Sequence, residues 1–436
     1  MNPFEKKILK QTLLEWRADS RLPLDRVLNE TFREYRVGQQ QRATLSEAAF
    51  LGVRVWPWTM GIAGSPEKPD EMRAFEAFIE DLLTLPAERF FQKHRKAKPQ
   101  FETNRKEHLL TVHGIPGALL GSWSPGEASE RAFHEYLHAS FDPAPLAVRI
   151  NTLKITREEA LAKWESHGAR ASLYSPDGII FPSRVPLQED SFFLAGAAEV
   201  QDEHSQLVGH FLGLKSGMKV LDLCAGAGGK TLHMAALMQN QGEIHSYDIS
   251  REKLSKLGER CKKAGVTIAR SIDKTALEKT KDKYDLVLVD APCSSLGTLR
   301  RNPDRILKWD SRESQALSQV QSELVFQARS LVKPGGQLAY ATCTIRPQEN
   351  LEKLNTLITD VASAQQKWSA HPFMDRVPPA FFDRLATNPA TLLAGSPLSK
   401  DSHWLQWGPE SRNDGGQLSG ALSGDGFFLA LYNRER

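Results

Sequence analysis

Two cysteines stand at positions where sulfur could do chemistry. Cys293 follows the apolar run 284–290, and Cys343 follows the apolar run 337–342. Both runs are predicted to be parallel strands, and the carboxyl ends of such strands form the edge of a sheet where ligands bind. A buried cysteine is ordinarily a small apolar side chain. The placement of two thiols at one edge instead predicts a reactive pair.

A glycine-rich turn, Cys-Ala-Gly-Ala-Gly-Gly-Lys-Thr at 224–231, follows the first strand predicted for the same sheet. The dinucleotide fingerprint GxGxxG would need glycine at 231, which is Thr231, and a P-loop would need glycine at 224, which is Cys224. The shorter GxG that remains is typical of sheets that bind S-adenosylmethionine, which has no pyrophosphate to place on a helix N-terminus. The turn favours this methyl donor and leaves the other two ligands open.

Carboxylates end the next three predicted strands, at Asp248, Asp273 and Asp290. A carboxylate after the second strand can accept hydrogen bonds from both ribose hydroxyls of an adenosine-containing ligand. Asp248 has that position. Asp248 and Asp273 taken singly could equally be solvated groups at strand ends.

The elements that must position these residues alternate between strands and helices from about residue 205 onward. Such repetition predicts an α/β fold with a doubly wound, mainly parallel, Rossmann-like sheet. Asp310 and Glu313 form a capping-box pattern before a long helix. The expected organisation is a helical domain over 1–135, a small α+β segment over 136–204 and the main domain over 205–436. Strands are predicted at 146–151, 178–181, 219–224, 243–248, 266–273, 284–290 and 337–342.

Composition narrows the class of protein. The 436 residues suffice for two or three domains, and a net charge of +3 permits a polyanionic partner without requiring one. The four cysteines include no CxxC pair and no cluster with zinc-ligand spacing, so free thiols and no metal are expected. Cys224 and Cys261 are interpreted as ordinary buried thiols, although the Cys224 backbone belongs to the glycine turn. No apolar run approaches the ~20 residues of a membrane span, and a cytoplasmic monomer is predicted.

Three motifs carry a resemblance to a known family. Asp290-Ala-Pro-Cys-Ser, Thr342-Cys343 and the Gly-Lys-Thr of the turn resemble motifs of the RsmB/NSUN family of RNA cytosine-5 methyltransferases, over about two-thirds of the chain. The segment 297–304 (GTLRRNPD) is similar to the bacterial branch that acts on small-subunit ribosomal RNA, and 1–135 resembles a NusB-like RNA-binding domain. The chain departs from the family in reading Ala-Gly-Ala-Gly for Ala-Ala-Pro-Gly in the turn, and Ala-Thr-Cys-Thr for Ser-Thr-Cys-Ser at the second cysteine.

The resemblance implies methylation of cytosine C5 with S-adenosylmethionine as cofactor. Cys343 would add to C6 of the base, because the thiolate is a strong nucleophile and its addition makes C5 enamine-like. Asp290 would hydrogen-bond the ring edge, protonated or sharing a proton. Cys293 would assist the release of the product. An enzyme acting on DNA would use the Pro-Cys thiol as its nucleophile, so the second thiol, at Thr-Cys, indicates RNA.

The remaining expectations concern binding. RNA, most of all ribosomal RNA, is the expected partner, with its target base flipped out of the stack. A P-loop-like nucleotide hydrolase and a non-catalytic RNA-binding assembly protein are the alternatives. The predicted RNA contacts are Arg149, Arg300, Arg301 and Asn302. The predicted cofactor-binding residues are Cys224, Ala225, Gly226, Ala227, Gly228, Gly229, Lys230, Asp248, Asp273 and Asp290.

Overall fold

The computed structural model divides the chain into two compact units. The first comprises Met1–Glu130 with Thr298–Glu313, and the second comprises Arg131–Gly297 with Ser314–Arg436. The predicted end of the helical domain at 135 lies near Glu130, but the assignment of 298–313 to the first unit was not expected. The structure describes residues 1–18, 22–60, 69–85, 144–182, 185–306, 308–354, 367–377, 404–407 and 424–435, with a few single residues and short pairs between them.

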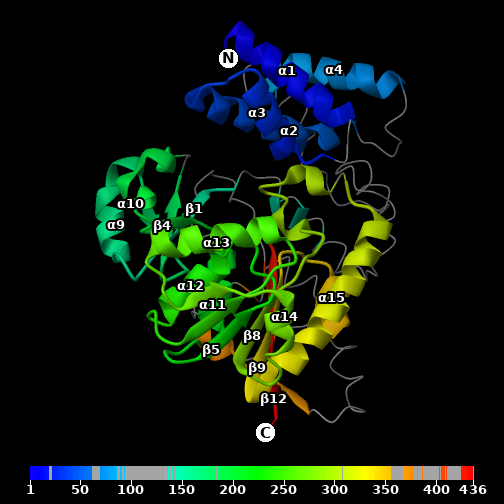
Figure 1. Cartoon of the computed structure of the whole chain (residues 1–436). Coiled ribbons are helices and arrows are strands. Elements are labelled where there is room, and N and C mark those ends of the chain that lie inside the picture. The colour runs from blue at the N-terminus through cyan, green and yellow to red at the C-terminus, as the bar shows by residue number, and fades with distance from the viewer. Residues whose placement is uncertain are drawn as a thin grey trace. The chain divides into compact units, whose positions relative to one another are not determined.

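The first unit is helical in the part that the structure describes, as predicted (Figure 1). Its helices bury apolar stripes against one another, with Trp16, Trp56 and Phe75 among the buried side chains. The later segment joins this unit through Asp304, whose Oδ2 accepts a hydrogen bond from the Leu24 backbone N–H at 3.2 Å. The elements are α1 (Pro3–Ala18), α2 (Leu24–Glu34), α3 (Gln39–Met60), α4 (Pro69–Thr84) and the 3-10 helix η4 (Pro303–Arg305).

A small antiparallel sheet precedes the main sheet of the second unit. Its strand order is β2-β3-β1-β4, and its inner face packs on Trp164 beside Phe181. Helix α9 begins with a complete capping box between Thr156 and Glu159. The α+β prediction is therefore confirmed here. The elements are β1 (Leu146–Ile150), α9 (Arg157–Lys163), β2 (Arg170–Ala171), β3 (Gly178–Phe181), α10 (Ser191–Leu194) and β4 (Ala198–Val200).

The main sheet is mixed, with the order β10-β12-β9-β8-β5-β6-β7 and β11 paired to β12. The five strands from β9 to β7 run parallel, and β12 is antiparallel to β9. β9 starts earlier than predicted, since residues 332–336 extend the strand through an irregularity opposite Tyr284–Leu286. The strands are β5 (Lys219–Asp222), β6 (Glu243–Ser246), β7 (Ala269–Ser271), β8 (Tyr284–Asp290), β9 (Val332–Thr342), β10 (Trp368–Ala370), β11 (Trp404–Trp407) and β12 (Phe427–Arg434).

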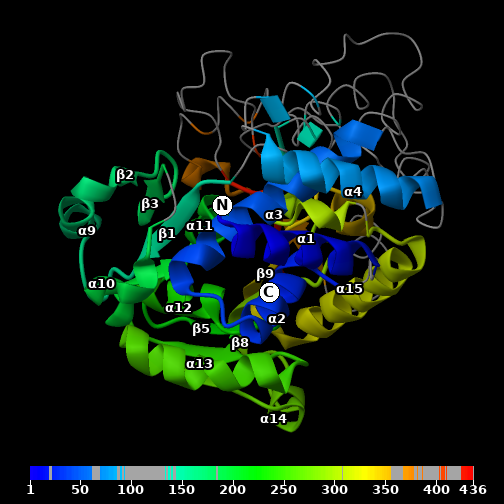
Figure 2. The ribbon, with the colours of Figure 1, turned by 90° about the horizontal axis from the view of Figure 1, so that it is seen from above.

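Helices cover both faces of this sheet, as a doubly wound fold requires. Alternate residues of β8 point to opposite sides: Leu286 and Leu288 join one core, Val287 and Val289 the other. The first core takes residues from α11, α12 and α13, and the second takes residues from α14 and α15; α12 and α15 flank the strands in Figures 1 and 2. The helices are α11 (Glu203–Phe211), α12 (Gly229–Leu237), α13 (Arg251–Ala264), α14 (Lys274–Glu278) and α15 (Ser311–Leu331).

The predicted capping residue of α15 is confirmed, because Asp310 Oδ1 accepts hydrogen bonds from the Arg312 and Glu313 backbone N–H groups at 2.6 and 3.2 Å. Over the described residues, no helix combines the length and apolar character that crossing a membrane would need.

Candidate active site

The glycine turn joins β5 to α12 and leaves space above its backbone. Gly226 and Gly228 both have positive φ, at 55° and 90°. The φ of Gly228 would strain any other residue, and a Cβ there would also lie 2.3 Å from Leu257 Cδ1. A Cβ at Gly226 or Gly229 would meet nothing within 4 Å. A ligand can therefore approach the backbone at these two positions, which fits a small adenosine-containing cofactor.

Asp248 lies directly beside this turn, after β6. Its Oδ2 accepts a hydrogen bond from the Gly226 backbone N–H at 2.7 Å, and its Oδ1 accepts one from the Ser250 N–H at 2.7 Å. The neighbouring Ile249 is 91% exposed, an unusual position for a large apolar side chain. The carboxylate of Asp248 suits the hydroxyls of a ribose, and the exposed side chain of Ile249 suits the face of a flat heterocyclic ring.

Asp273 is held differently. It is exposed and caps α14, with its Oδ1 accepting a hydrogen bond from the Ala276 backbone N–H at 2.7 Å. The sequence predicted the position of this carboxylate at a strand end, but its contact is with its own helix.

Lys230 and Asp290 form an ion pair at the same edge. Lys230 Nζ lies 2.6 Å from Asp290 Oδ2 and 5.5 Å from the centre of the Phe427 ring. Burial disfavours the ammonium, but the attraction of Asp290 outweighs it and raises the pKa of Lys230 above its ordinary value. The ammonium is thus engaged by Asp290, a pairing that its place in the turn did not reveal.

The two cysteine thiols meet at the ends of β8 and β9, which are paired and parallel. Cys293 Sγ lies 3.4 Å from Cys343 Sγ, and Ser295 Oγ lies 3.5 Å from Cys343 Sγ. The Cys293 thiol donating to Cys343 lowers the pKa of Cys343, and the same contact, together with burial, raises the pKa of Cys293. The site therefore favours a thiolate at Cys343 beside a protonated Cys293.

Buried polar contacts fix the loop that carries Cys293. Glu349 is 1% exposed, and its Oε2 accepts hydrogen bonds from the Ser294 backbone N–H at 2.9 Å and from Gln321 Nε2 at 3.1 Å. Gly297 closes the loop, since its N–H donates to the Cys343 carbonyl at 2.9 Å. A Cβ at Gly297 would lie 2.0 Å from the Gly426 carbonyl oxygen. The two cysteine loops and the start of β12 are consequently locked together.

Asp222 lies beneath the turn and is 1% exposed. Its Oδ2 accepts a hydrogen bond from Thr231 Oγ1 at 2.7 Å, and burial raises the pKa of Asp222 to about 7. The folded protein therefore keeps a proton that the unfolded chain releases near pH 4. This contribution to stability is full below about pH 4 and is lost as the pH rises toward about 7.

We expect Asp222→Asn to flatten that pH dependence, because an amide cannot ionise. Between about pH 5 and about pH 8 the native protein should lose a few kcal/mol of unfolding free energy that the variant keeps. Urea unfolding of the full chain at the two pH values measures the difference. An equal loss in both proteins would show that Asp222 is not the group responsible.

The predicted RNA contacts separate into two groups. Arg149 and Arg300 are each 2% exposed, so neither side chain is presented at the surface, and their contact with RNA stays a prediction. Arg149 supports the turn, with Nη1 donating to the Gly229 carbonyl at 3.0 Å and to Gln201 Oε1. Arg301 and Asn302 are partly exposed, and Asn302 Nδ2 donates to Thr298 Oγ1 at 3.1 Å. Their contact with RNA stays a prediction.

Sequence reasoning missed Ile249, Ser295 and Glu349. Ile249 carried a weak signal, because it is an apolar residue directly after the carboxylate that ends a strand. Nothing in the local sequence around Ser295 or Glu349 predicted their roles. Their roles depend on the packing of loops that are far apart in the chain.

Family models match two parts of the chain. The model described as "16S rRNA methyltransferase RsmB/F" covers residues 210–375, and the model described as "Methyltr_RsmF/B-like, ferredoxin-like domain" covers residues 128–188. The "Probable ribosomal RNA small subunit methyltransferase B" of Bacillus subtilis (strain 168) is 31% identical over 277 residues, 61% of each chain. The "Ribosomal RNA small subunit methyltransferase B" of Enterobacter sp. (strain 638) is 33% identical over 52% of this chain and 54% of that protein. The chain thus matches less than two thirds of the length of these relatives.

Solved structures share the fold. A "Methyltransferase Homolog Protein" from Pyrococcus horikoshii has a TM-score of 0.58 at 21% identity, over 77% of this chain and all of that one. NSun6 from the same organism, solved with SFG, has a TM-score of 0.55 at 19% identity, over 72% and 98%. The fold and the glycine turn define a methyltransferase domain of the S-adenosylmethionine-dependent class. The family models and the relatives show that these parts of the chain are similar to RsmB/F-type ribosomal RNA methyltransferases.

Proposed function

We propose that the protein methylates carbon 5 of cytosine in small-subunit ribosomal RNA through a covalent bond between Cys343 Sγ and C6 of the base. The observation that carries this proposal is the pair of thiols 3.4 Å apart beside the Lys230–Asp290 ion pair. Support for the ribosomal target comes from the similar proteins of Bacillus subtilis and Enterobacter, which are described as ribosomal RNA small subunit methyltransferases.

The first step needs a nucleophile that is ionised near neutral pH. The hydrogen bond from Cys293 lowers the pKa of Cys343, and the Ser295 hydroxyl can donate a second hydrogen bond to the thiolate. The thiolate forms a bond to C6, and the electrons of the C5–C6 double bond move into the ring. C5 then becomes the nucleophile. S-adenosylmethionine, when bound, would supply an electrophilic methyl group.

The negative charge that develops on the pyrimidine ring needs stabilisation. Asp290 and Lys230 offer a proton-bearing pair at the edge where the thiols lie, 2.6 Å apart. Fixed donors that face a developing charge in a site shielded from water are among the strongest catalytic devices. We propose that Asp290 hydrogen-bonds the nitrogen edge of the pyrimidine ring. Lys230 would hold Asp290 in place and stabilise the negative charge that develops near it.

The final step must remove the C5 proton and break the C6–S bond. Transfer of the C5 proton to a water molecule returns the C–H electrons to the C5–C6 double bond and expels Cys343 as a thiolate. Cys293 is adjacent to that sulfur, and its raised pKa keeps it protonated. It can therefore stabilise the departing thiolate by hydrogen bonding. We assign Cys293 to this release step.

The proposed cofactor contacts use the open turn, Asp248 and Ile249. Asp248 would accept hydrogen bonds from the ribose, and Ile249 would cover one face of the adenine. Arg301 and Asn302 are kept as candidate contacts to the flanking RNA backbone.

The experiment that tests the function measures transfer of a tritiated methyl group from S-adenosylmethionine to small-subunit ribosomal RNA from cells that lack this protein. We expect about one methyl group per RNA, and bisulfite sequencing should locate it as one protected cytosine. Ribosomal RNA from cells that contain the protein should accept no further label. Labelling of ribose or of another base would overturn the C5 assignment, and labelling of transfer RNA alone would overturn the ribosomal target.

A further inference from the structure

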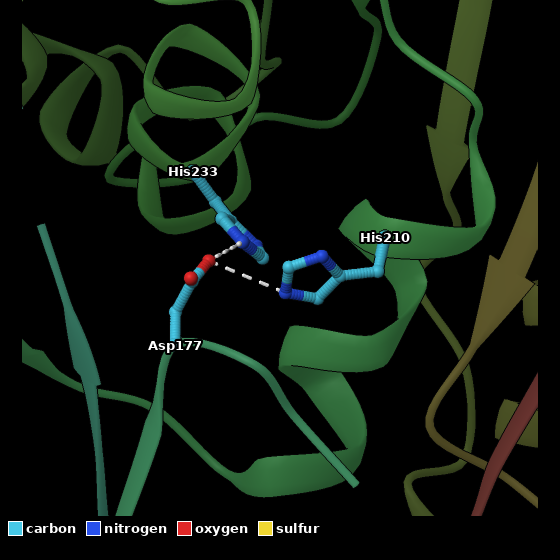
Figure 3. Close-up of side chains that lie close together, drawn as sticks. All are labelled: Asp177, His210 and His233. Carbon is cyan, nitrogen blue, oxygen red and sulfur yellow. Dashed lines mark hydrogen bonds and ion pairs between the residues drawn. The ribbon is translucent and has the colours of Figure 1, made fainter. Parts of the chain in front are cut away.

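A second cluster of ionisable side chains lies outside the cysteine site, in the second unit. It consists of Asp177, immediately before β3, His210 on α11 and His233 on α12 (Figure 3). One carboxylate oxygen, Asp177 Oδ2, lies 3.3 Å from His210 Nε2 and 3.4 Å from His233 Nε2. Two imidazoles from different helices thus converge on one oxygen from the small antiparallel sheet.

The two distances from Asp177 Oδ2 to the imidazole nitrogens match the edge of a metal coordination tetrahedron. Zinc binds imidazole nitrogen and carboxylate oxygen at about 2.0–2.2 Å, so two ligand atoms of a tetrahedral site are about 3.3 Å apart. All three donor atoms lie within 4.8 Å of one another. The two rings are nearly perpendicular, at 77°, with their centres 4.9 Å apart, which lets both nitrogens face a common point.

Hydrogen bonding alone accounts poorly for the arrangement. Among the described residues, the Nε2 atom of His210 is buried and has no hydrogen-bond partner of acceptable geometry, although it is 3.3 Å from Asp177. A buried donor or acceptor left in that state costs free energy. A cation placed between the three atoms would use the lone pair of each nitrogen.

The cluster is fully buried at His233 and partly exposed at its other two residues. The His233 side chain is 1% exposed and its ring rests on Gly209, where an added Cβ would lie 2.5 Å from Nδ1. The side chains of Asp177 and His210 are 13% and 15% exposed. Asp177 and His210 are thus the members of the cluster nearest to solvent, and packing holds the ring of His233 in place.

We propose that Asp177, His210 and His233 bind a zinc-type divalent cation, with a water molecule as its fourth ligand. Two imidazoles and one carboxylate form a donor set that suits zinc and cobalt. The ion would join the small antiparallel sheet to α11 and to α12, the helix that begins at the cofactor turn. Its role would be to fix these elements to one another. The three residues are far apart in the chain, so no short sequence motif with metal-ligand spacing predicts the site.

Cobalt titration tests this site directly. The full chain, without an affinity tag and after treatment with a chelator, is titrated with Co²⁺ while visible absorption is recorded. We expect one ion per chain, the intense bands of four-coordinate cobalt, and their loss when Zn²⁺ is added. Weak bands of octahedral cobalt, or no saturable binding at one equivalent, would overturn the proposal.

Conservative variants identify the ligands. Asp177→Asn and His210→Gln should each weaken Co²⁺ binding at least about tenfold and remove the tetrahedral bands. His167→Gln, which changes an exposed histidine outside the cluster, should bind as the native protein does. Circular dichroism with chelator present checks that each variant is folded, and Zn²⁺ should raise the melting temperature of the native protein and of His167→Gln alone. Unchanged binding in both cluster variants would refute the assignment.

The titration needs neither RNA nor methyl donor. Its failure would therefore leave the proposed methyltransferase activity untouched.

Discussion

Cys343→Ala is expected to abolish methyl transfer, with kcat reduced by about 10⁴-fold or more. Alanine has no group that can add to C6, and without that bond C5 of cytosine is too weak a nucleophile to attack a methyl group. Removal of a covalent nucleophile is among the most damaging changes that an active site can suffer. The measurement is single-turnover transfer of tritiated methyl groups to small-subunit ribosomal RNA. Binding of S-adenosylmethionine, followed by calorimetry, should stay close to that of the native protein.

The matched control is Cys261→Ala. Cys261 is buried on α13, makes no contact among the described residues that ties it to the cysteine loops or to the Lys230–Asp290 pair, and has its pKa raised by burial. Its removal tests whether loss of any cysteine harms the enzyme, and activity should be retained. If Cys343→Ala kept full turnover while Cys293→Ala lost it, the nucleophile would be the Pro-Cys thiol, as in enzymes that act on DNA.

The sheet and its ligand edge were predictable because their signals are local. The strand at 284–290 was predicted with the bounds that it has, since its four consecutive buried positions, 286–289, are all apolar in the sequence. The predicted strands ending at Cys224 and Asp248 were each two residues too long, because β5 and β6 stop at Asp222 and Ser246 where the chain turns toward the ligand side. The side-by-side placement of Cys293 and Cys343 followed from topology alone.

The charge network of the site was less predictable, because it depends on where long side chains end. Lys230 was expected to serve the cofactor, but its Nζ reaches across to Asp290. Arg149 was expected on a surface facing RNA, but it is buried and donates to the turn. The alternation of residues along a strand predicts which face of the sheet a side chain lies on. It does not predict whether other elements of the fold pack over that face. Here α11 packs against β1, and Arg149 donates to the Gly229 carbonyl at the start of α12.

The contrast between the two thiols leads to the second large effect. In the structure they are separated by 3.4 Å, yet their pKa values move in opposite directions. A pair that shares one proton in this way can divide the reaction, with one sulfur attacking and the other assisting departure. The loop of Cys293 is held by Glu349 and that of Cys343 by the Gly297 contact. These contacts keep the two sulfur atoms close enough for one to attack the base while the other stabilises the departing thiolate.

Cys293→Ala should therefore trap the protein on its RNA. Cys343 can still add to C6 and C5 can still be methylated, but the departing thiolate loses the hydrogen bond that stabilises it, so the C6–S bond breaks slowly. The expected result is a protein–RNA adduct that survives a denaturing gel and is removed by ribonuclease. Cys293→Ser keeps a hydroxyl donor at the same place and should accumulate less adduct. The double variant Cys293→Ala/Cys343→Ala should form none, because the attacking sulfur is gone. An adduct of equal yield in that double variant would mean that the bond to RNA does not involve Cys343, and the mechanism would have to be abandoned.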